Sequence, residues 1–101
     1  MEIIIHTTDN NIRVEMCGRI DTASSATCEQ ELQPVFSQAD KHIELDCAQL
    51  TYISSSGLRL FLSLLKRVQA SKGTLKVTHL NNDIYEVFRM TGFSKLFYIE
   101  A

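Results

Sequence analysis

Residues 46–60, with the sequence DCAQLTYISSSGLRL, connect a short buried strand to the clearest helical pattern of the chain. The strand is predicted at residues 42–46, and the helix is predicted to begin at Ser55 or Ser56. From there, apolar residues recur three and four positions apart, as a buried helical stripe requires, at Leu58, Phe61, Leu62, Leu65 and Val68. The serines thus lie at the amino end of a helix, where a partial positive charge favours a negative group.

The remaining strands are predicted on both sides of this motif. Residues 1–6 and 12–16 read as two strands of a hairpin, and Gly18 is expected to end the second one. Residues 74–79 contain several β-branched residues, which predicts a further strand. The apolar tail 93–99 is expected to attach to the core. The pattern predicts an α/β fold with a mixed sheet of four to five strands, a hairpin followed by parallel strands, covered by helices.

Two more helices are predicted from their capping residues. Asp21 and Thr22 offer side-chain oxygens to a helix that would begin near Ala23. Pro34 falls within that helical pattern, so the helix is expected to be kinked or split there. Asn81 is expected to begin the cap of a last helix.

Length and charge limit the function classes. A chain of 101 residues with 45% hydrophobic residues suits one domain, and a net charge of −2 offers no broad positive field for nucleic acid. No apolar run is long enough to span a bilayer, so no membrane insertion and a cytoplasmic location are expected. The cysteines, which are odd in number and widely spaced, are expected to be reduced core thiols: Cys17, Cys28 and Cys47.

No group of side chains predicts catalysis or metal binding. The histidines fall in or beside predicted strands, without an obvious acid partner and without metal-ligand spacing, at His6, His42 and His79. Asp21 and Asp46 would both lie at the top of the sheet, where paired carboxylates suit acid–base chemistry or a magnesium ion, but capping and turn roles are favoured. Phosphate-binding glycine motifs are absent, so no cofactor, metal or enzyme activity is predicted.

The triple serine has two interpretations. Ser54, Ser55 and Ser56 can act as helix caps alone. Alternatively, the loop controls charge, because a phosphate on a serine adds about −1.5 to −2 charges at a site where α/β sheets present functional groups. Gly57 is then expected to leave room beside Ser56 for the active site of another protein.

Three segments of the chain carry a resemblance to a known family. Residues 14–23, VEMCGRIDTA, provide a strand, a glycine, an apolar residue, an aspartate and a helix start with small residues. Residues 46–60 provide an aspartate, an apolar spacer and a serine-glycine-leucine signature, and residues 91–97, TGFSKLF, provide a closing threonine-glycine-apolar segment. In this order, and over essentially the whole chain, they resemble the STAS domains of bacterial anti-sigma-factor antagonists. The resemblance implies a single STAS domain over residues 1–101.

The resemblance also implies a mechanism, which is partner switching. The serine directly before the glycine, Ser56, matches the phosphorylated residue of the family, and Asp21 and Asp46 match its aspartates. In such proteins the unphosphorylated antagonist binds an anti-sigma factor that is also a serine kinase, phosphorylation ends the binding, and a cognate phosphatase is implied. ATP and magnesium belong to that kinase. The residues expected to bind the partner are Asp21, Thr22, Asp46, Ser54, Ser55, Ser56, Gly57 and Arg59.

One departure from the family pattern leaves alternatives open. Many members have an aspartate where this chain has Ser54, so one acidic contact to the kinase is missing. A second interpretation is a constitutive STAS interaction subunit of a lipid-trafficking transporter or a stress-sensing assembly, with the serine as a cap only. A third is a small-ligand or nucleotide sensor that binds an anion through Arg19 and Arg59. The chain is expected to be a monomer or a weak dimer.

Overall fold

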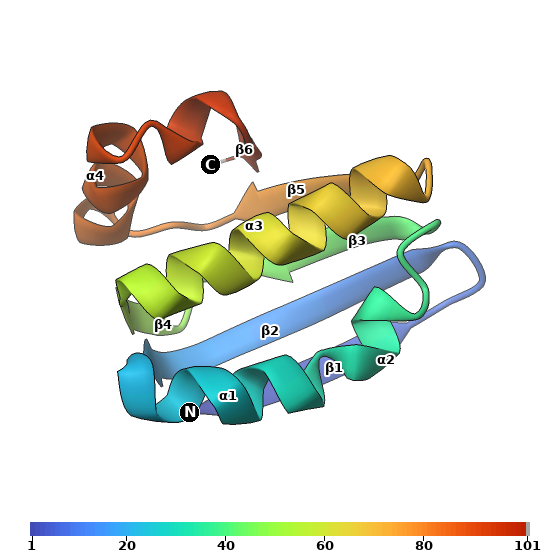
Figure 1. Cartoon of the computed structure of the whole chain (residues 1–101), viewed down its shortest axis with the longest axis horizontal. Coiled ribbons are helices and arrows are strands. Elements are labelled where there is room, and N and C mark those ends of the chain that lie inside the picture. The colour runs from blue at the N-terminus through green and yellow to red at the C-terminus, as the bar shows by residue number, and fades with distance from the viewer. Residues whose placement is uncertain (101) are drawn as a thin grey trace.

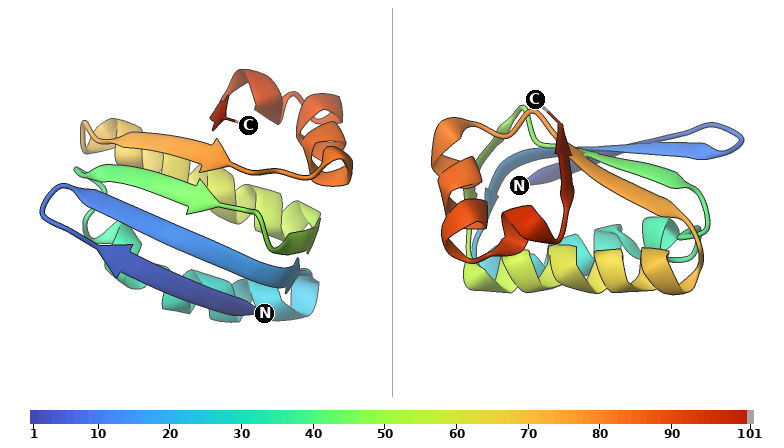
Figure 2. Two further views of the ribbon diagram at one scale, coloured as in Figure 1. Left: turned by 180° about the vertical axis from the view of Figure 1, so that it is seen from behind. Right: turned by 90° about the horizontal axis from the view of Figure 1, so that it is seen from above.

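The computed structural model describes residues 1–100, which form a layer of strands and a layer of helices (Figure 1). The strands are β1 (Glu2–Thr7), β2 (Asn11–Ile20), β3 (His42–Asp46), β4 (Leu50–Ile53), β5 (Thr74–Thr78) and β6 (Tyr98–Glu100). The helices are α1 (Thr22–Glu31), α2 (Gln33–Phe36), α3 (Ser55–Ala70) and α4 (Asn82–Met90), and a 3₁₀ turn, η1, spans Phe93–Lys95. Helices α1, α2 and α3 lie against one face of the sheet, and no helix of residues 1–100 covers the opposite face (Figure 2).

The sheet is mixed, as the sequence predicts. Its main order is β1-β2-β3-β5-β6, in which β1 is antiparallel to β2 and the other neighbours are parallel. Strand β4 pairs with β2 outside this order. The α/β fold class is thereby confirmed, and the sheet has six strands rather than four to five because the short strands β4 and β6 also pair.

Gly18 does not end the second strand, contrary to the prediction. The strand β2 continues to Ile20 through an irregularity between Gly18 and Arg19, where Gly18 has a φ of 105°. A bulge with a left-handed glycine bends a strand without terminating it. Before this point β2 pairs with β3, and after it β2 pairs with β4, so the last residues of β2 turn toward the loop that carries the serines.

The core lies between the sheet and the helices. Alternate residues of β2 and β3 point into it, as half-buried strands require, at Ile12, Val14, Met16, Ile43 and Leu45. The predicted stripe of α3 faces them, with Phe61 and Val68 each 1% exposed, and Leu64, which was not among the predicted residues, is equally buried. Phe61 also contacts Phe88 of α4 edge to face, with ring centroids 6.1 Å apart. Phe97 of the tail contacts Phe61 as well, with ring centroids 6.5 Å apart, and is 5% exposed, so the tail is attached to the core as expected.

The helix boundaries follow the predicted caps and breaks. α1 ends at Glu31, and a new short helix, α2, begins at Gln33 with Pro34 in its first turn, so the predicted break is a split. Asn81 caps α4, because its side-chain oxygen accepts a hydrogen bond from the backbone N–H of Ile84.

The cysteines are free thiols. Cys28 and Cys47 are buried, as predicted, whereas Cys17 is half-buried. Burial raises the pKa of the Cys47 thiol to about 12. None of the helices in residues 1–100 combines the length and apolar character that crossing a bilayer requires.

Candidate functional site

The triple serine forms the start of α3. Ser54 is the N-cap: its Oγ accepts a hydrogen bond from the backbone N–H of Gly57 at 3.2 Å, and the residue is only 8% exposed. Ser55 and Ser56 are the first two residues of the helix, so their N–H groups precede the ladder of backbone bonds inside it. The cap interpretation therefore holds for Ser54, and the other two serines are not needed for it.

Ser56 lines a groove between α1 and α3. Its side chain is half-buried, and its Oγ accepts a 3.4 Å hydrogen bond from a guanidinium nitrogen of Arg59, one helical turn later. The groove has a volume of about 380 Å³ and is lined by Ser25, Ala26, Glu29, Ser56, Arg59, Leu60 and Ser63. The Ser56 hydroxyl thus opens onto a surface hollow on the helical side of the domain.

Gly57 has a different role from the predicted one. A side chain at this position would not obstruct access to Ser56, because it would point into the core. Its Cβ would lie 2.8 Å from Ile20 Cγ2 and 2.8 Å from Ile53 Cγ1. The glycine therefore permits the first turn of α3 to approach β2 and β4 closely, and the expectation that it makes room for an outside protein is wrong.

The amino ends of α1 and α3 are tied together through β2. The backbone N–H of Ser54 donates a 2.8 Å hydrogen bond to the carbonyl oxygen of Ile20, the residue just before the cap of α1. That cap is Asp21, as predicted: its carboxylate accepts a 2.8 Å bond from the backbone N–H of Ser24. Thr22 follows as the exposed first residue of α1. The structure thus brings Asp21, Thr22 and the triple serine to one end of the domain.

Asp21 is a charged cap. The hydrogen bond from the backbone N–H of Ser24 is the largest influence on this carboxyl, followed by the bond to the Ser24 side chain, and together they lower the pKa of Asp21. The carboxylate is therefore ionised at neutral pH beside the positive end of α1.

Arg19 and Tyr52 form an aromatic–cation pair at the same end of the domain, which was not predicted from the sequence. The two residues are register partners on β2 and β4, and the guanidinium carbon lies 4.4 Å from the centre of the tyrosine ring. Tyr52 is 41% exposed. Leu50 and Ile53 are buried and the two residues between them are exposed, so β4 lacks the alternation by which a strand is predicted from the sequence.

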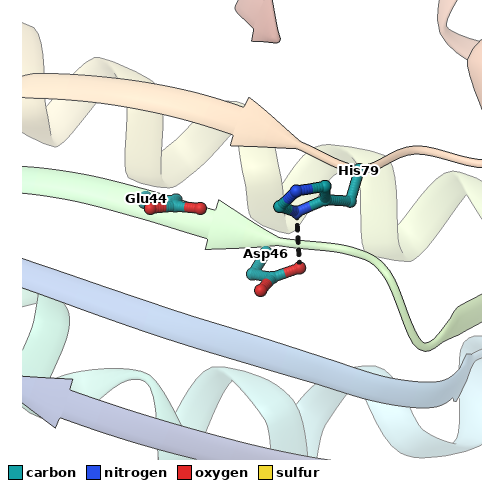
Figure 3. Close-up of side chains that lie close together, drawn as sticks. All are labelled: Glu44, Asp46 and His79. Atoms are coloured by element: carbon teal, nitrogen blue, oxygen red, sulfur yellow. Dashed lines mark hydrogen bonds and ion pairs between the residues drawn. The ribbon is translucent and has the colours of Figure 1, made fainter. Parts of the chain in front are cut away.

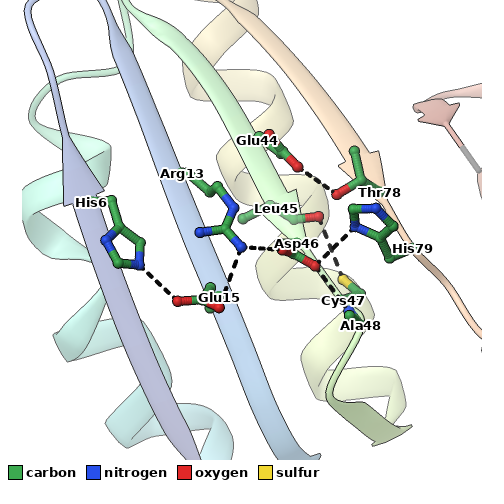
Figure 4. A network of polar contacts seen from close by, with 10 residues as sticks. All are labelled: His6, Arg13, Glu15, Glu44, Leu45, Asp46, Cys47, Ala48, Thr78 and His79. Carbon is green, nitrogen blue, oxygen red and sulfur yellow. Dashed lines mark hydrogen bonds and ion pairs between the residues drawn. The ribbon is translucent and has the colours of Figure 1, made fainter.

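Asp46 lies apart from these residues, on the sheet face that no helix covers. It is 6% exposed, and its Oδ2 accepts a 2.7 Å bond from Arg13 on the neighbouring strand β2 (Figure 4). Its Oδ1 accepts bonds from the backbone N–H of Ala48 at 3.0 Å and from His79 Nδ1 at 3.1 Å. The structure does not bring Asp46 together with Asp21 as a carboxylate pair, because each carboxylate has its own partners.

Hydrogen bonds outweigh burial at Asp46. Burial is the largest single influence and on its own would raise the pKa of this carboxyl. The bonds from Ala48, Arg13 and His79 act in the opposite direction, and their sum lowers the pKa of Asp46. Asp46 is therefore an ionised member of a charge network on the open face, and its contribution to partner binding stays a prediction.

Two histidines have acid partners, contrary to the sequence-based prediction. His6 lies 2.7 Å from Glu15 and His79 lies 3.1 Å from Asp46 (Figure 4). Each pair joins residues on different strands or loops, nine positions apart for His6 and Glu15 and 33 for His79 and Asp46, so neither pair has a local sequence signal. Their side-chain hydrogen bonds within residues 1–100 go to carboxylates and not to a serine hydroxyl, so they do not assemble a catalytic triad there.

The sequence of residues 4–99 matches the model of a family described as "Mlab, STAS domain". The chain belongs to the STAS family. This STAS domain is 32% identical over 94 residues to the anti-sigma-B factor antagonist of Bacillus subtilis (strain 168), a match that covers 92% of this chain and 84% of that protein. It is thus a STAS domain of the anti-sigma-factor antagonist family.

Solved structures share the fold of this STAS domain. An anti-sigma factor antagonist from Mycobacterium paratuberculosis superposes with a TM-score of 0.85 at 18% identity, over 97% of this chain and 83% of that one. The Bacillus cell fate determinant SpoIIAA in its phosphorylated form superposes with a TM-score of 0.74 at 16% identity, over 99% of this chain and 92% of that one. At these identities the likeness concerns the fold alone.

Proposed function

We propose that this STAS domain is an anti-sigma-factor antagonist that acts by partner switching in the cytoplasm. Unphosphorylated, it binds an anti-sigma factor with serine-kinase activity, and phosphorylation of Ser56 by that kinase releases it until a cognate phosphatase removes the phosphate. The domain itself is a regulator and not an enzyme. The relative from Bacillus subtilis is named as an anti-sigma-B factor antagonist, and SpoIIAA is described in a phosphorylated form, which supports this proposal.

The observation that carries the proposal is the position of the Ser56 hydroxyl. It opens onto the groove between α1 and α3, while the cap of α3 is supplied by Ser54 alone. A phosphate on Ser56 would therefore add about −1.5 to −2 charges to the surface without removing the cap. Its negative charge would be favoured in the free protein by the amino end of α3 and by the guanidinium of Arg59.

The same phosphate would oppose a docked partner. A dianion buried at an interface loses its hydration and repels nearby carboxylates, and the single charge of Arg59 matches only part of its charge. Glu29 of α1 lines the same groove, so the local field already contains one negative group. A loss of about 3 kcal/mol in binding would lower the affinity more than a hundredfold.

Ser54 stands where many family members have an aspartate, but it still serves as the N-cap of α3. An aspartate and a serine are equally good N-caps, and Ser54 is buried with its oxygen directed at Gly57. The position therefore supports the helix start rather than presenting a side chain to a partner. On this proposal, the partner-facing residues at this end are Thr22, Ser55, Ser56 and Arg59, next to the capping residue Asp21.

The test uses the cognate anti-sigma kinase, to be sought first among the products of the genes that neighbour the gene for this chain. Intact mass after incubation with kinase and ATP should show one added phosphate, and peptide mapping should place it on Ser56. Binding measured by calorimetry should be lost on Ser56→Asp, by at least about a hundredfold, and kept by Ser56→Ala. Ser37→Asp adds the same charge at an exposed position outside the groove and should bind as the unmodified chain does.

Equal capture of the kinase by Ser56→Asp and Ser56→Ala would overturn the switch. Such a result, together with no added phosphate, would favour the constitutive STAS interaction subunit. The family description "Mlab, STAS domain" is the observation that supports this second function. Ser56 would then be only the second residue of α3, and neither variant would change binding.

A further inference from the structure

Three side chains with metal-binding atoms meet on the open face of the sheet. Glu44, Asp46 and His79 each direct one ligand atom to a common point, and these atoms lie within 4.8 Å of one another (Figure 3). Zinc bonds of about 2.0–2.2 Å place tetrahedral ligand atoms roughly 3.4 Å apart, so these atoms would have to move closer together to hold an ion. Two of the residues lie on strand β3 and the third, His79, directly follows β5, so no spacing in the sequence reveals them.

The backbone explains why they meet. Glu44 and Asp46 are two positions apart on β3 and so point to the same face of the sheet. His79 follows β5, on which Thr78 lies opposite Asp46 in register. Continued alternation would point His79 to the helical side, but its φ of 60° turns the side chain back over the open face.

Existing contacts hold the two carboxylates in place. The Oε2 atom of Glu44 accepts a 2.7 Å bond from the Thr78 hydroxyl, and Arg13 holds Oδ2 of Asp46. The other oxygen of Asp46 faces His79. Partners of this kind orient metal-binding carboxylates in proteins, so the arrangement supplies an outer layer of contacts as well as the ligands.

The charge around this point favours a cation. Carboxylates on the open face near these residues outnumber the permanently charged bases: Glu15, Glu44, Asp46 and Glu100 stand against Arg13 and Lys76. Arg13 reduces the attraction of this surface for a cation, but its guanidinium already donates hydrogen bonds to Glu15 and Asp46. An anionic ligand would have to displace them.

We propose that Glu44, Asp46 and His79 form a binding site for a divalent transition-metal ion of the zinc class. Two carboxylate oxygens and one imidazole nitrogen make three protein ligands, and His79 is 53% exposed in its side chain, which leaves the remaining coordination position open to solvent. Magnesium is disfavoured because it prefers oxygen ligands in octahedral geometry. The site lies on the face opposite the Ser56 groove and does not depend on the proposed function.

The test is calorimetric titration of the purified chain with Zn²⁺, carried out in a Cys17→Ser background so that the half-buried thiol does not compete. One ion should bind per chain, with no comparable heat from Mg²⁺. His79→Asn keeps a residue that tolerates the left-handed backbone but removes the imidazole, and it should weaken binding by at least about tenfold. Glu44→Gln should weaken it to a similar extent.

His42→Asn is the matched control. His42 is an exposed histidine on the same strand, hydrogen-bonded to Thr74, and its replacement should leave the zinc affinity unchanged. Nuclear magnetic resonance of the imidazole nitrogens should show zinc-dependent shifts at His79 and not at His42. Unchanged affinity in His79→Asn, loss of binding in His42→Asn, or no saturable 1:1 binding in the starting protein would each overturn the proposal.

Discussion

Ser54 donates its backbone N–H to the carbonyl oxygen of Ile20 over 2.8 Å, and this bond joins the start of α3 to the end of β2. Ile20 in turn is followed directly by Asp21, the cap of α1. The two helix starts that the sequence resemblance assigns to partner binding are therefore joined by a hydrogen bond at one corner of the domain. A disturbance of the packing at this corner should be measurable as a loss of stability.

Gly57→Ala is expected to destabilise the domain. Alanine normally stabilises a helix relative to glycine by about 1 kcal/mol, but here the added methyl would lie 2.8 Å from carbons of Ile20 and Ile53. Overpacking of this kind costs about 1–3 kcal/mol. Urea denaturation should show a lower midpoint with an unchanged slope. Ser63→Ala, on an exposed turn of the same helix, is the control, and equal or higher stability of Gly57→Ala would contradict the packing described here.

Substitutions at Ser54 should separate the cap from the charge. Ser54→Ala removes the oxygen that accepts the N–H of Gly57 and is expected to cost about 0.5–2 kcal/mol. Ser54→Asp restores the acceptor and adds a favourable charge at the helix start, so its stability should be close to that of the unmodified chain. Thermal unfolding of the three proteins measures the difference, and a stable Ser54→Ala would show that the cap is unimportant.

Asp21 should give a pH-dependent contribution to stability. Its pKa is lowered in the folded state from the ordinary value of 3.8, mainly by the hydrogen bond from the backbone N–H of Ser24. The stabilisation is therefore fully present above that ordinary value and is lost as the pH falls through the lower, folded-state pKa. Asp21→Asn should be less stable than the unmodified chain at pH 7, and the gap should close on acidification. A gap that is constant down to pH 2 would contradict this.

Native Cys47 should resist alkylation. Burial raises the pKa of its thiol to about 12, and burial also raises the pKa of Cys28, so neither presents a thiolate at pH 8. Iodoacetamide added to the folded protein should modify neither residue, and addition in denaturant should modify both. Peptide mapping by mass spectrometry distinguishes these cases, and rapid modification of Cys47 in the folded chain would show that the end of β3 opens easily.

Local sequence signals predicted those parts of the fold that depend on neighbouring residues. The caps at Asp21, Ser54 and Asn81 and the break at Pro34 all follow from short-range hydrogen bonding and backbone restriction, and all are present. The stripe of α3 follows from periodicity over 16 residues. These signals require no knowledge of what lies across the sheet.

Features that depend on distant residues could not be predicted in this way. Strands β4 and β6 have four and three residues, too few for a periodic pattern. Ile20 and Ile53, which lie on other strands, are the residues that a side chain at position 57 would meet, so its inward direction could not be predicted from neighbouring residues. His79 reaches the open face only because of its left-handed backbone, so its partnership with Asp46 has no signature in the sequence.

The one-sided covering of the sheet has a consequence for assembly. The groove that contains Ser56 lies between two helices, whereas the charged strand surface around Asp46 points away from them. A protein seated over the helices would leave the bare strands accessible, and a molecule resting on the strands would leave the helices accessible. One partner on the helices and another on the open strand face could therefore bind the domain at the same time without contacting each other.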